Sequence, residues 1–224
     1  TALLNGDKSI MITVQTVVYE MDEGAILAQE ELVLGDFSNQ LKKDSKNFIS
    51  TYNDSDVNTG AVLDYSAECG ARMISKILSE ISSTGVKPTG RAQKGEASYT
   101  EMITKADAKI DWTQSAEKIV NKIHACCPDP CAWTTENGQP LKLLKAHDAT
   151  EYLAQTAQMD TAFQTVFDEK PGTVIRCDKN CGILITAGNK TVVAVPFLQR
   201  QGKNALDSTS FMNGARCFSG TVLE

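Results

Sequence analysis

The sequence lacks several features that mark common classes of protein. No apolar run approaches the roughly 20 residues that a membrane-spanning helix needs, and no secretory signal is visible at its start. It also lacks a surplus of positive charge, since its net charge is -6. A basic field over the whole chain, of the kind that drives nucleic-acid binding, is therefore excluded.

The shortage of basic residues is uneven along the chain. Residues 1–97 hold 9 basic and 14 acidic side chains, whereas residues 98–224 hold 13 and 14. If either half binds a polyanion, the second half is the better candidate. The chain also begins at Thr1 without a methionine, as though within a domain, so we expect further sequence upstream.

The seven cysteines do not follow the spacing of a zinc ribbon. An odd number without a secretory signal indicates reduced thiols in a cytosol-like compartment. Five of them lie near His124 or form a later pair, and zinc binding is the alternative for this set: Cys126, Cys127, Cys131, Cys177 and Cys181. We expect buried free thiols and no metal.

An acidic turn stands out within residues 13–33, TVQTVVYEMDEGAILAQEELV. β-Branched residues at 13–18 and partial alternation at 25–34 predict two strands. Gly24 after two acids indicates a tight turn, because glycine takes positive φ without steric cost. Asp22 is then expected at the mouth of this turn, where its carboxylate can face a cleft. The alternative is a solvated turn without function.

A long helix is predicted at 56–82, where apolar residues recur every three or four positions. Asn58 or Thr59 can cap its start. Gly70 in its middle costs about 1 kcal/mol relative to alanine, so we expect it to permit a close helix contact. Residues 83–98 are rich in Gly and Pro and predict a solvated linker.

The second half changes to one helix and short strands. The helix is predicted at 111–124, and the strands at 132–135, 140–145, 172–178, 181–187 and 191–199. Asn137-Gly138 between apolar runs is a strong hairpin signal. This pattern is typical of a small β-barrel with an attached helix. Trp112 and Trp133 are interpreted as core anchors, with base-stacking platforms as the alternative.

The order of several motifs resembles the methionyl-tRNA formyltransferase family, over nearly the whole chain. The motifs are LLNGDK, MDEGAILAQEEL, NTGAVLDYSAECGARMISKIL, the KIDW and CCPDPCAWTTENGQPLKL elements, PGTVI, GILITAG and FLQRQGKNALDSTSFMNG. The resemblance implies an α/β fragment, the C-terminal part of a Rossmann-like formyltransferase domain, at 1–83. It implies a linker at 84–104 and an OB-like barrel domain with an attached helix at 105–224.

The resemblance also implies a reaction, the transfer of a formyl group from formyl-tetrahydrofolate to the methionyl amino group of initiator tRNA in translation initiation. The amine attacks the formyl carbon, and a proton moves from the amine to the leaving nitrogen. The family uses an Asn as oxyanion donor, a His, and an Asp that matches Asp22. The implied folate contacts are Thr16, Val18, Tyr19, Met21 and Gly24.

The sequence departs from the family in one important respect. The family's Asn and His lie upstream of Thr1, and His124 and His147 match nothing catalytic. We therefore expect this chain by itself not to transfer formyl groups. The resemblance further implies that the second half holds tRNA, with Lys105, Arg200 and Lys203 as phosphate contacts and Lys109 as a further candidate. The alternative is that these basic side chains are only solvated. The loop at 35–59 is longer than is usual in the family.

Two alternatives remain open from the sequence. One is another folate-dependent enzyme, a sugar N-formyltransferase or the hydrolase domain of formyl-tetrahydrofolate dehydrogenase. The other is a non-catalytic tRNA-binding module with a degenerate first half. The expected partners are initiator Met-tRNA and the folate co-substrate, with no membrane and a monomeric state. The expected location is the mitochondrial matrix, with the bacterial cytoplasm as the alternative.

Overall fold

The computed structural model describes residues 1–34, 57–159, 166–215 and 217–224. By their contacts these residues form two compact units. The C-terminal unit holds Thr1, Leu3–Gly6 and Met102–Glu224, and the N-terminal unit holds Ala2 and Asp7–Glu101. Most of the long loop expected at 35–59 lies outside the described residues.

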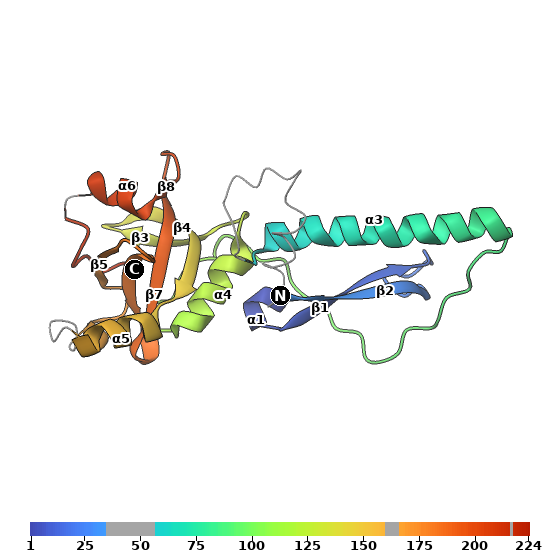
Figure 1. The fold of residues 1–224 in the computed structure, drawn as a ribbon, viewed down its shortest axis with the longest axis horizontal. Helices are drawn as coiled ribbons and strands as arrows, with labels where there is room; N and C mark the ends of the chain where they lie inside the picture. Colours follow the sequence, from blue (N-terminus) through green and yellow to red (C-terminus); the bar gives the residue numbers. More distant parts are fainter. Residues whose placement is uncertain (35–56, 160–165, 216) are drawn as a thin grey trace. The chain divides into compact units, whose positions relative to one another are not determined.

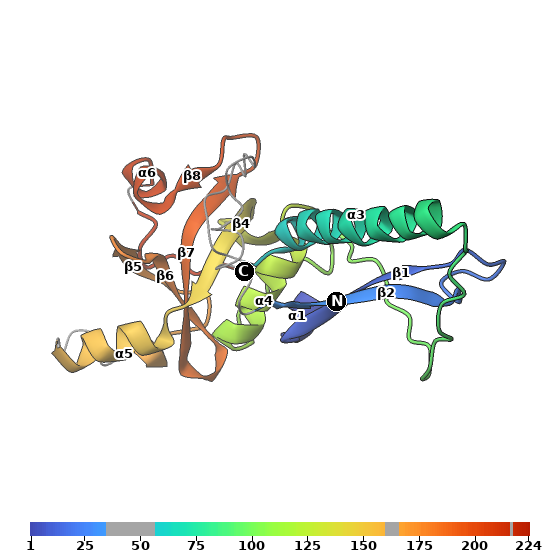
Figure 2. The same cartoon turned by 45° about the vertical axis from the view of Figure 1, so that its right-hand side comes forward.

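The N-terminal unit combines a two-stranded sheet with one long helix. β1 (Ser9–Gln15) and β2 (Ile26–Val33) pair antiparallel. β2 agrees with the strand predicted at 25–34, whereas β1 lies upstream of the strand predicted at 13–18 and shares only residues 13–15 with it. The long helix α3 (Thr59–Thr84) lies along this strand pair in both views (Figures 1 and 2). A short helix, α1 (Ala2–Asn5), precedes β1.

Both ends of α3 are fixed by caps. The side chain of Asn58 accepts a hydrogen bond from the N–H of Ala61 at 3.0 Å, so Asn58 is the N-cap. At the other end Gly85 has a φ of 71° and donates its N–H to the carbonyl of Ile81. The close contact expected at Gly70 is not made by any described residue, because a Cβ built there meets none of them within 4 Å.

The apolar core of the N-terminal unit is small. Four buried apolar side chains come from β2, from the residue after it, and from α3: Leu32, Leu34, Cys69 and Met73. Three large apolar side chains of α3 are instead mostly exposed: Leu63 at 62%, Ile74 at 47% and Leu78 at 59%. The apolar surface of α3 is therefore wider than the strand pair covers.

The C-terminal unit is built on a six-stranded antiparallel sheet in the order β3-β4-β7-β6-β5, with β8 paired to β7. Its strands are β3 (Ala132–Glu136), β4 (Gln139–Asp148), β5 (Val174–Asp178), β6 (Gly182–Ala187), β7 (Thr191–Arg200) and β8 (Leu206–Asp207). Its helices are α4 (Ala116–Cys126), α5 (Thr150–Met159) and α6 (Ser208–Asn213), with short 3-10 turns at Val166–Asp168 and Gly188–Lys190. The sequence predicts β3 to β7 and α4, whereas β8 and α6 are too short to give a periodic signal.

The last residues of the chain join the two edges of this sheet. Leu223 donates its N–H to the carbonyl of Gly172, just before β5, at 2.9 Å. Glu224 and Thr135 of β3 exchange two backbone hydrogen bonds, of 2.7 and 3.2 Å. The strand pairs themselves follow an open path from β3 to β5, and among the described strands none closes a barrel.

The main core of the C-terminal unit gathers around α4 and the strands of the sheet. The largest cluster of buried apolar side chains lies wholly within residues 108–223. Trp112 belongs to it, and its indole nitrogen donates to the hydroxyl of Thr134 at 2.9 Å. Asn137 and Gly138 both have positive φ, 50° and 76°, which confirms the predicted hairpin turn.

Of the helices within the described ranges, none combines the length and the apolar character that crossing a membrane requires.

Candidate functional site

Asp22 lies in a longer connection than the sequence predicts. β1 ends at Gln15 and β2 begins at Ile26, so the connection runs over residues 16–25. Its base is closed by Thr16 and Ala25, because the N–H of each donates to an oxygen of the other at 2.9 Å. The predicted tight turn is therefore wrong, and Asp22 sits in a broader loop.

The backbone of this loop also differs from the expectation about Gly24. The residue with positive φ is Asp22, at 61°. Glycine is required at position 24 for a steric reason instead, since a Cβ there would lie 1.7 Å from the carbonyl oxygen of Thr16. A non-glycine residue in the left-handed region costs about 1–3 kcal/mol and is often found at functional sites. The conformation of Asp22 is compatible with a site role.

Two glutamines hold Asp22 in this conformation. The side-chain amide of Gln93 donates to the carbonyl oxygens of Asp22 at 2.6 Å and Gly24 at 2.9 Å. The same amide nitrogen lies 2.9 Å from the side-chain oxygen of Gln15. Gln15 in turn donates to Oδ1 of Asp22 at 3.2 Å. One glutamine thus fixes the backbone of Asp22 and the other orients its carboxylate.

Gln93 reaches the loop because its segment pairs with β2 at one isolated bridge, while the residues of the segment stay exposed, as expected of a solvated linker. Arg91 and Ile26 exchange two backbone hydrogen bonds, of 2.8 and 2.9 Å, and the side chain of Arg91 donates to that of Gln29. A Cβ on Gly90 would lie 2.9 Å from the carbonyl oxygen of Ile26, so the close approach requires glycine. Sequence reasoning misses Gln93 because the Gly- and Pro-rich composition around it gives no sign of this pairing.

The predicted folate contacts all lie in this same loop, and three of them carry exposed apolar side chains. Thr16 is half-buried and Gly24 is buried, whereas three others are exposed: Val18 at 46%, Tyr19 at 99% and Met21 at 89%. The side chain of Asp22 is also exposed. The two pockets described below are not lined by any of these residues. The structure therefore brings the predicted residues together, but on an open loop.

The predicted tRNA contacts lie around a row of side chains on the sheet of the C-terminal unit. The strand register places Trp133 opposite Lys142, and Lys142 opposite Gln199. A parallel bridge links Lys109 to Trp133. Since residues directly opposite one another share a face, these four form what we call the Trp133 row. Lys105 adjoins it, because its carbonyl accepts a hydrogen bond from the indole of Trp133 at 2.7 Å.

A pocket of about 340 Å³ opens on the Trp133 row. Its lining combines lysines, prolines and the end of β7: Lys105, Pro130, Trp133, Pro140, Lys142, Gln199, Arg200, Gln201 and Gly202. Lys203 follows in the adjacent turn, where its carbonyl accepts a hydrogen bond from the side chain of Gln199 at 2.7 Å. The structure therefore brings Lys105 to the pocket and Lys203 to the turn beside it.

Arg200 already has a partner for its side chain. In the register it stands opposite the buried Leu141, so its side chain lies on the opposite face of the sheet from the Trp133 row. Its Nε and Nη2 donate to the carboxylate of Glu136 at 2.7 and 2.6 Å, and its guanidinium lies 4.4 Å from the centre of the Phe211 ring. The hydrogen bonds that Arg200 donates to Glu136 raise the pKa of Arg200. A phosphate contact by Arg200 stays a prediction, and it requires this bidentate pair to open.

The cysteines are free thiols: four are buried, Cys177 and Cys181 are half-buried, and Cys217 is exposed. Desolvation raises the pKa of Cys126 and Cys131, and it raises the pKa of Cys181 to about 12. These thiols are therefore protonated, and not nucleophilic, at neutral pH. Within the described ranges, no three His, Cys, Asp or Glu side chains gather closely enough to hold a metal ion.

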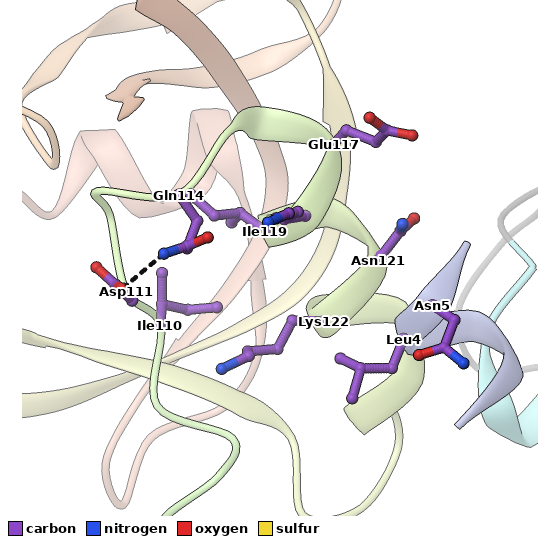
Figure 3. A pocket seen from close by; sticks show the side chains of 10 residues that line it. Leu4, Asn5, Ile110, Asp111, Gln114, Glu117, Ile119, Asn121 and Lys122 are labelled. Carbon is purple, nitrogen blue, oxygen red and sulfur yellow. Dashed lines mark hydrogen bonds between the residues drawn. The ribbon is translucent and has the colours of Figure 1, made fainter. Parts of the chain in front are cut away.

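A second pocket, of about 530 Å³, lies between Leu4 and Asn5 and the start of α4 (Figure 3). The side-chain amide of Gln114 donates to Asp111 at 3.1 Å on one side of it. Its rim carries acidic and basic side chains, and the predicted site residues do not line it.

Comparison with known proteins gives a consistent result. Residues 102–216 match the family described as formyl transferase, C-terminal domain. The chain is 31% identical over 217 residues to the methionyl-tRNA formyltransferase of Treponema denticola, and 29% identical over 223 residues to that of Thiobacillus denitrificans. These matches cover 97% and 99% of the chain, but 58% and 60% of the relatives.

Solved structures show the same kind of fold. The chain superposes on HypX from Aquifex aeolicus, solved in complex with tetrahydrofolic acid, with a TM-score of 0.59 at 16% identity. That match covers 97% of this chain and 32% of HypX, and it concerns the fold alone. The motif-based resemblance to formyltransferases is confirmed by the sequence matches. Because the matched family covers more than half of its residues, this chain belongs to the family of formyl transferase C-terminal domains.

Proposed function

We propose that this protein transfers a formyl group from formyl-tetrahydrofolate to the methionyl amino group of initiator Met-tRNA. One observation carries the proposal: the similarity to methionyl-tRNA formyltransferases runs through 97% of the chain, at 31% identity. It therefore includes both the loop of Asp22 and the Trp133 row. Because the chain spans 58% of that relative, the activity is proposed for the gene product that carries this sequence.

Asp22 is the proposed acid–base residue of this chain. In the reaction the amine attacks the formyl carbon, the bond from that carbon to the donor nitrogen breaks, and a proton passes from the amine to that nitrogen. A carboxylate can orient a histidine or a water for such a transfer. The hydrogen bond from Gln15 at 3.2 Å supports this role, because it fixes the direction of the carboxylate.

The loop of Asp22 is also the proposed folate surface. Its exposed side chains, Val18, Tyr19 and Met21, offer apolar area that a flat ring system can cover. Thr16 and Gly24 set the loop's shape through the contacts at its base. The folate is a co-substrate in this proposal, and the protein supplies its position beside Asp22.

The finer architecture and the location are also proposals. An OB-like barrel is supported by the backbone hydrogen bonds through which residues 223–224 join both sheet edges. The Rossmann-like assignment of residues 1–83 and the boundaries at 84 and 104 rest on the sequence motifs. The monomeric state and the mitochondrial location stay predictions, and the relatives named above, which are bacterial, give the latter no support.

A formylation assay on the gene product tests the proposal. With formyl-tetrahydrofolate and initiator Met-tRNA we expect formylmethionyl-tRNA, and we expect Asp22→Asn to lower kcat/KM by about 100-fold or more, as general acid–base catalysis contributes roughly 10²–10⁴. The neighbouring exposed acid gives the control, since Glu23→Gln should keep its activity. Residues 1–224 alone are expected to give no turnover.

The acceptor separates this proposal from its alternatives. An amino-sugar nucleotide serves as a second substrate in the same assay. Formylation of the sugar but not of Met-tRNA would contradict the proposal in favour of a sugar N-formyltransferase. Release of formate without an acceptor would favour the hydrolase, and tRNA binding without any turnover would favour the non-catalytic module.

A further inference from the structure

The two tryptophans of the chain lie in different local environments. Trp112 is 4% exposed and donates its indole hydrogen bond inside the core. Trp133 is partly buried against the same core and also lines the 340 Å³ pocket. The prediction of a core anchor is confirmed for Trp112, whereas Trp133 also presents aromatic surface to a possible ligand.

Three hydrogen bonds hold Trp133, one made by its ring and two by its backbone. Its indole nitrogen donates to the carbonyl of Lys105 at 2.7 Å. Its backbone N–H donates to Ala108 at 3.0 Å, and its carbonyl accepts from Ile110 at 2.8 Å. A ring fixed in this way loses little conformational freedom when another ring stacks against it.

Positive charge gathers around this ring. The ammonium of Lys109 lies 5.6 Å from the ring centre, Lys142 stands directly opposite in the register, and Lys105 lines the pocket. Among the ion pairs of the described ranges, none uses these three lysines. Asp129 precedes Pro130 at the rim and offsets part of the charge. The balance favours an anionic ligand.

The size of the pocket limits which anion fits. A volume of about 340 Å³ lies near the lower end for ligand sites, which run from roughly 300 to 1,000 Å³. It has room for one nucleobase but not for a double helix. A lysine-lined groove with an aromatic ring is also how proteins bind single strands without reading their sequence.

We propose that the Trp133 row binds an unpaired nucleotide of RNA, with its base against Trp133 and the flanking phosphates on Lys105, Lys109 and Lys142. This inference rests on the proposed function, because it states which element of the tRNA the C-terminal unit takes. Lys109, which now lies over the ring, is exposed and free to turn toward a phosphate. The base stacks through its ring face, so the site accepts any base.

Fluorescence anisotropy on residues 1–224 tests the inference with a short labelled single-stranded RNA and with the same RNA annealed to its complement. We expect the single strand to bind more tightly than the duplex. Trp133→Ala should weaken single-strand binding by about 5- to 100-fold, because stacking contributes roughly 1–3 kcal/mol per base. Trp133→Phe keeps an aromatic ring, guards against misfolding of the alanine variant, and should restore most of the affinity.

The lysines give a second, independent measurement. Lys142→Gln should reduce the slope of log affinity against log salt by about 0.7, the value for one lost contact to a single strand. The matched control is Lys190→Gln, at the other end of β7, where Lys190 pairs with Asp168 at 2.7 Å. That variant should leave both the affinity and the salt slope unchanged.

Three results would overturn the inference: Trp133→Ala binding like wild type, tighter binding of the duplex, or equal effects of the two lysine variants. Initiator Met-tRNA is titrated in parallel to separate the two proposals. If tRNA binds and Trp133→Ala does not weaken it, the inference fails while the proposed function stands. If the gene product fails to bind tRNA at all, the proposed function fails as well.

Discussion

Asp22 keeps its left-handed backbone because neighbouring groups fix its conformation. Gly24 lacks the Cβ that would collide with Thr16, and the amide of Gln93 bridges the carbonyls of Asp22 and Gly24. Gln15 then directs the carboxylate. A strained residue persists only where its surroundings over-determine it, and here several groups do so. The position of Asp22 thus depends on side chains far from it in sequence.

Replacing Gln93 with alanine tests this arrangement. The change removes the side-chain hydrogen bonds to two carbonyls, each worth about 0.5–1.5 kcal/mol net, so we expect the N-terminal unit to lose about 1 kcal/mol of unfolding free energy. Amide hydrogen exchange at residues 22–25, followed by NMR, should accelerate. Lys94→Ala, at the next and exposed position, is the control. Similar exchange rates in the two variants would show that Gln93 does not hold the loop.

At the scale of the element, local sequence signals set the bounds of α3, whereas tertiary contacts set how it packs. Its length follows from the Asn58 cap and from Gly85 in the left-handed region. Its packing does not follow from the same signals. A Cβ built at Gly70 meets no described residue within 4 Å, while Leu63 and Leu78 remain exposed. The helical period thus predicts the helix but not which part of its apolar surface the strand pair covers.

Gly70→Ala should therefore stabilise the protein. Alanine restricts the unfolded chain and favours the helix by about 1 kcal/mol, and its methyl group has open space at this position. The comparison variant is Gly24→Ala, whose Cβ overlaps a carbonyl oxygen and should destabilise the N-terminal unit by about 1–3 kcal/mol. Urea denaturation followed by circular dichroism measures both. A loss of stability in Gly70→Ala would mean that another element contacts this side of α3.

At the scale of the whole molecule, the apolar core is unevenly shared. The largest buried cluster lies within residues 108–223, whereas few of the described side chains of the N-terminal unit are buried. Since burial of apolar area is the main favourable contribution to folding, the two units should differ in stability. Their contact-based separation also permits them to unfold in separate steps.

We expect unfolding to depend on the probe. The sequence has two tryptophans, Trp112 and Trp133, and both lie in the C-terminal unit, so their fluorescence reports on that unit alone. Far-ultraviolet circular dichroism includes the long helix α3 of the N-terminal unit. The dichroism transition should begin at a lower urea concentration than the fluorescence transition. Coincident curves would instead indicate a single cooperative unit.

The sequence by itself determined the features that depend on near neighbours. Alternation placed β2, the helical period placed α3 and α4, and Asn137-Gly138 placed the hairpin turn. The β-branched run at 13–18 located only the end of β1. The order of its motifs also indicated the formyltransferase family, because each motif is a contiguous stretch of residues that can be read without the fold. The tight turn at Gly24 failed because its geometry is set by Thr16 and not by the turn residues.

Only the tertiary structure decided which distant side chains meet. Gln93 reaches Asp22 across 71 positions, and Arg200 reaches Glu136 across 64. The first contact ties an exposed linker segment to the Asp22 loop, and the second gives Arg200, a predicted phosphate contact, an internal partner. Such pairs arise when strands and segments fold against one another, and a hydrogen bond between two side chains leaves no periodic trace in the sequence that forms it.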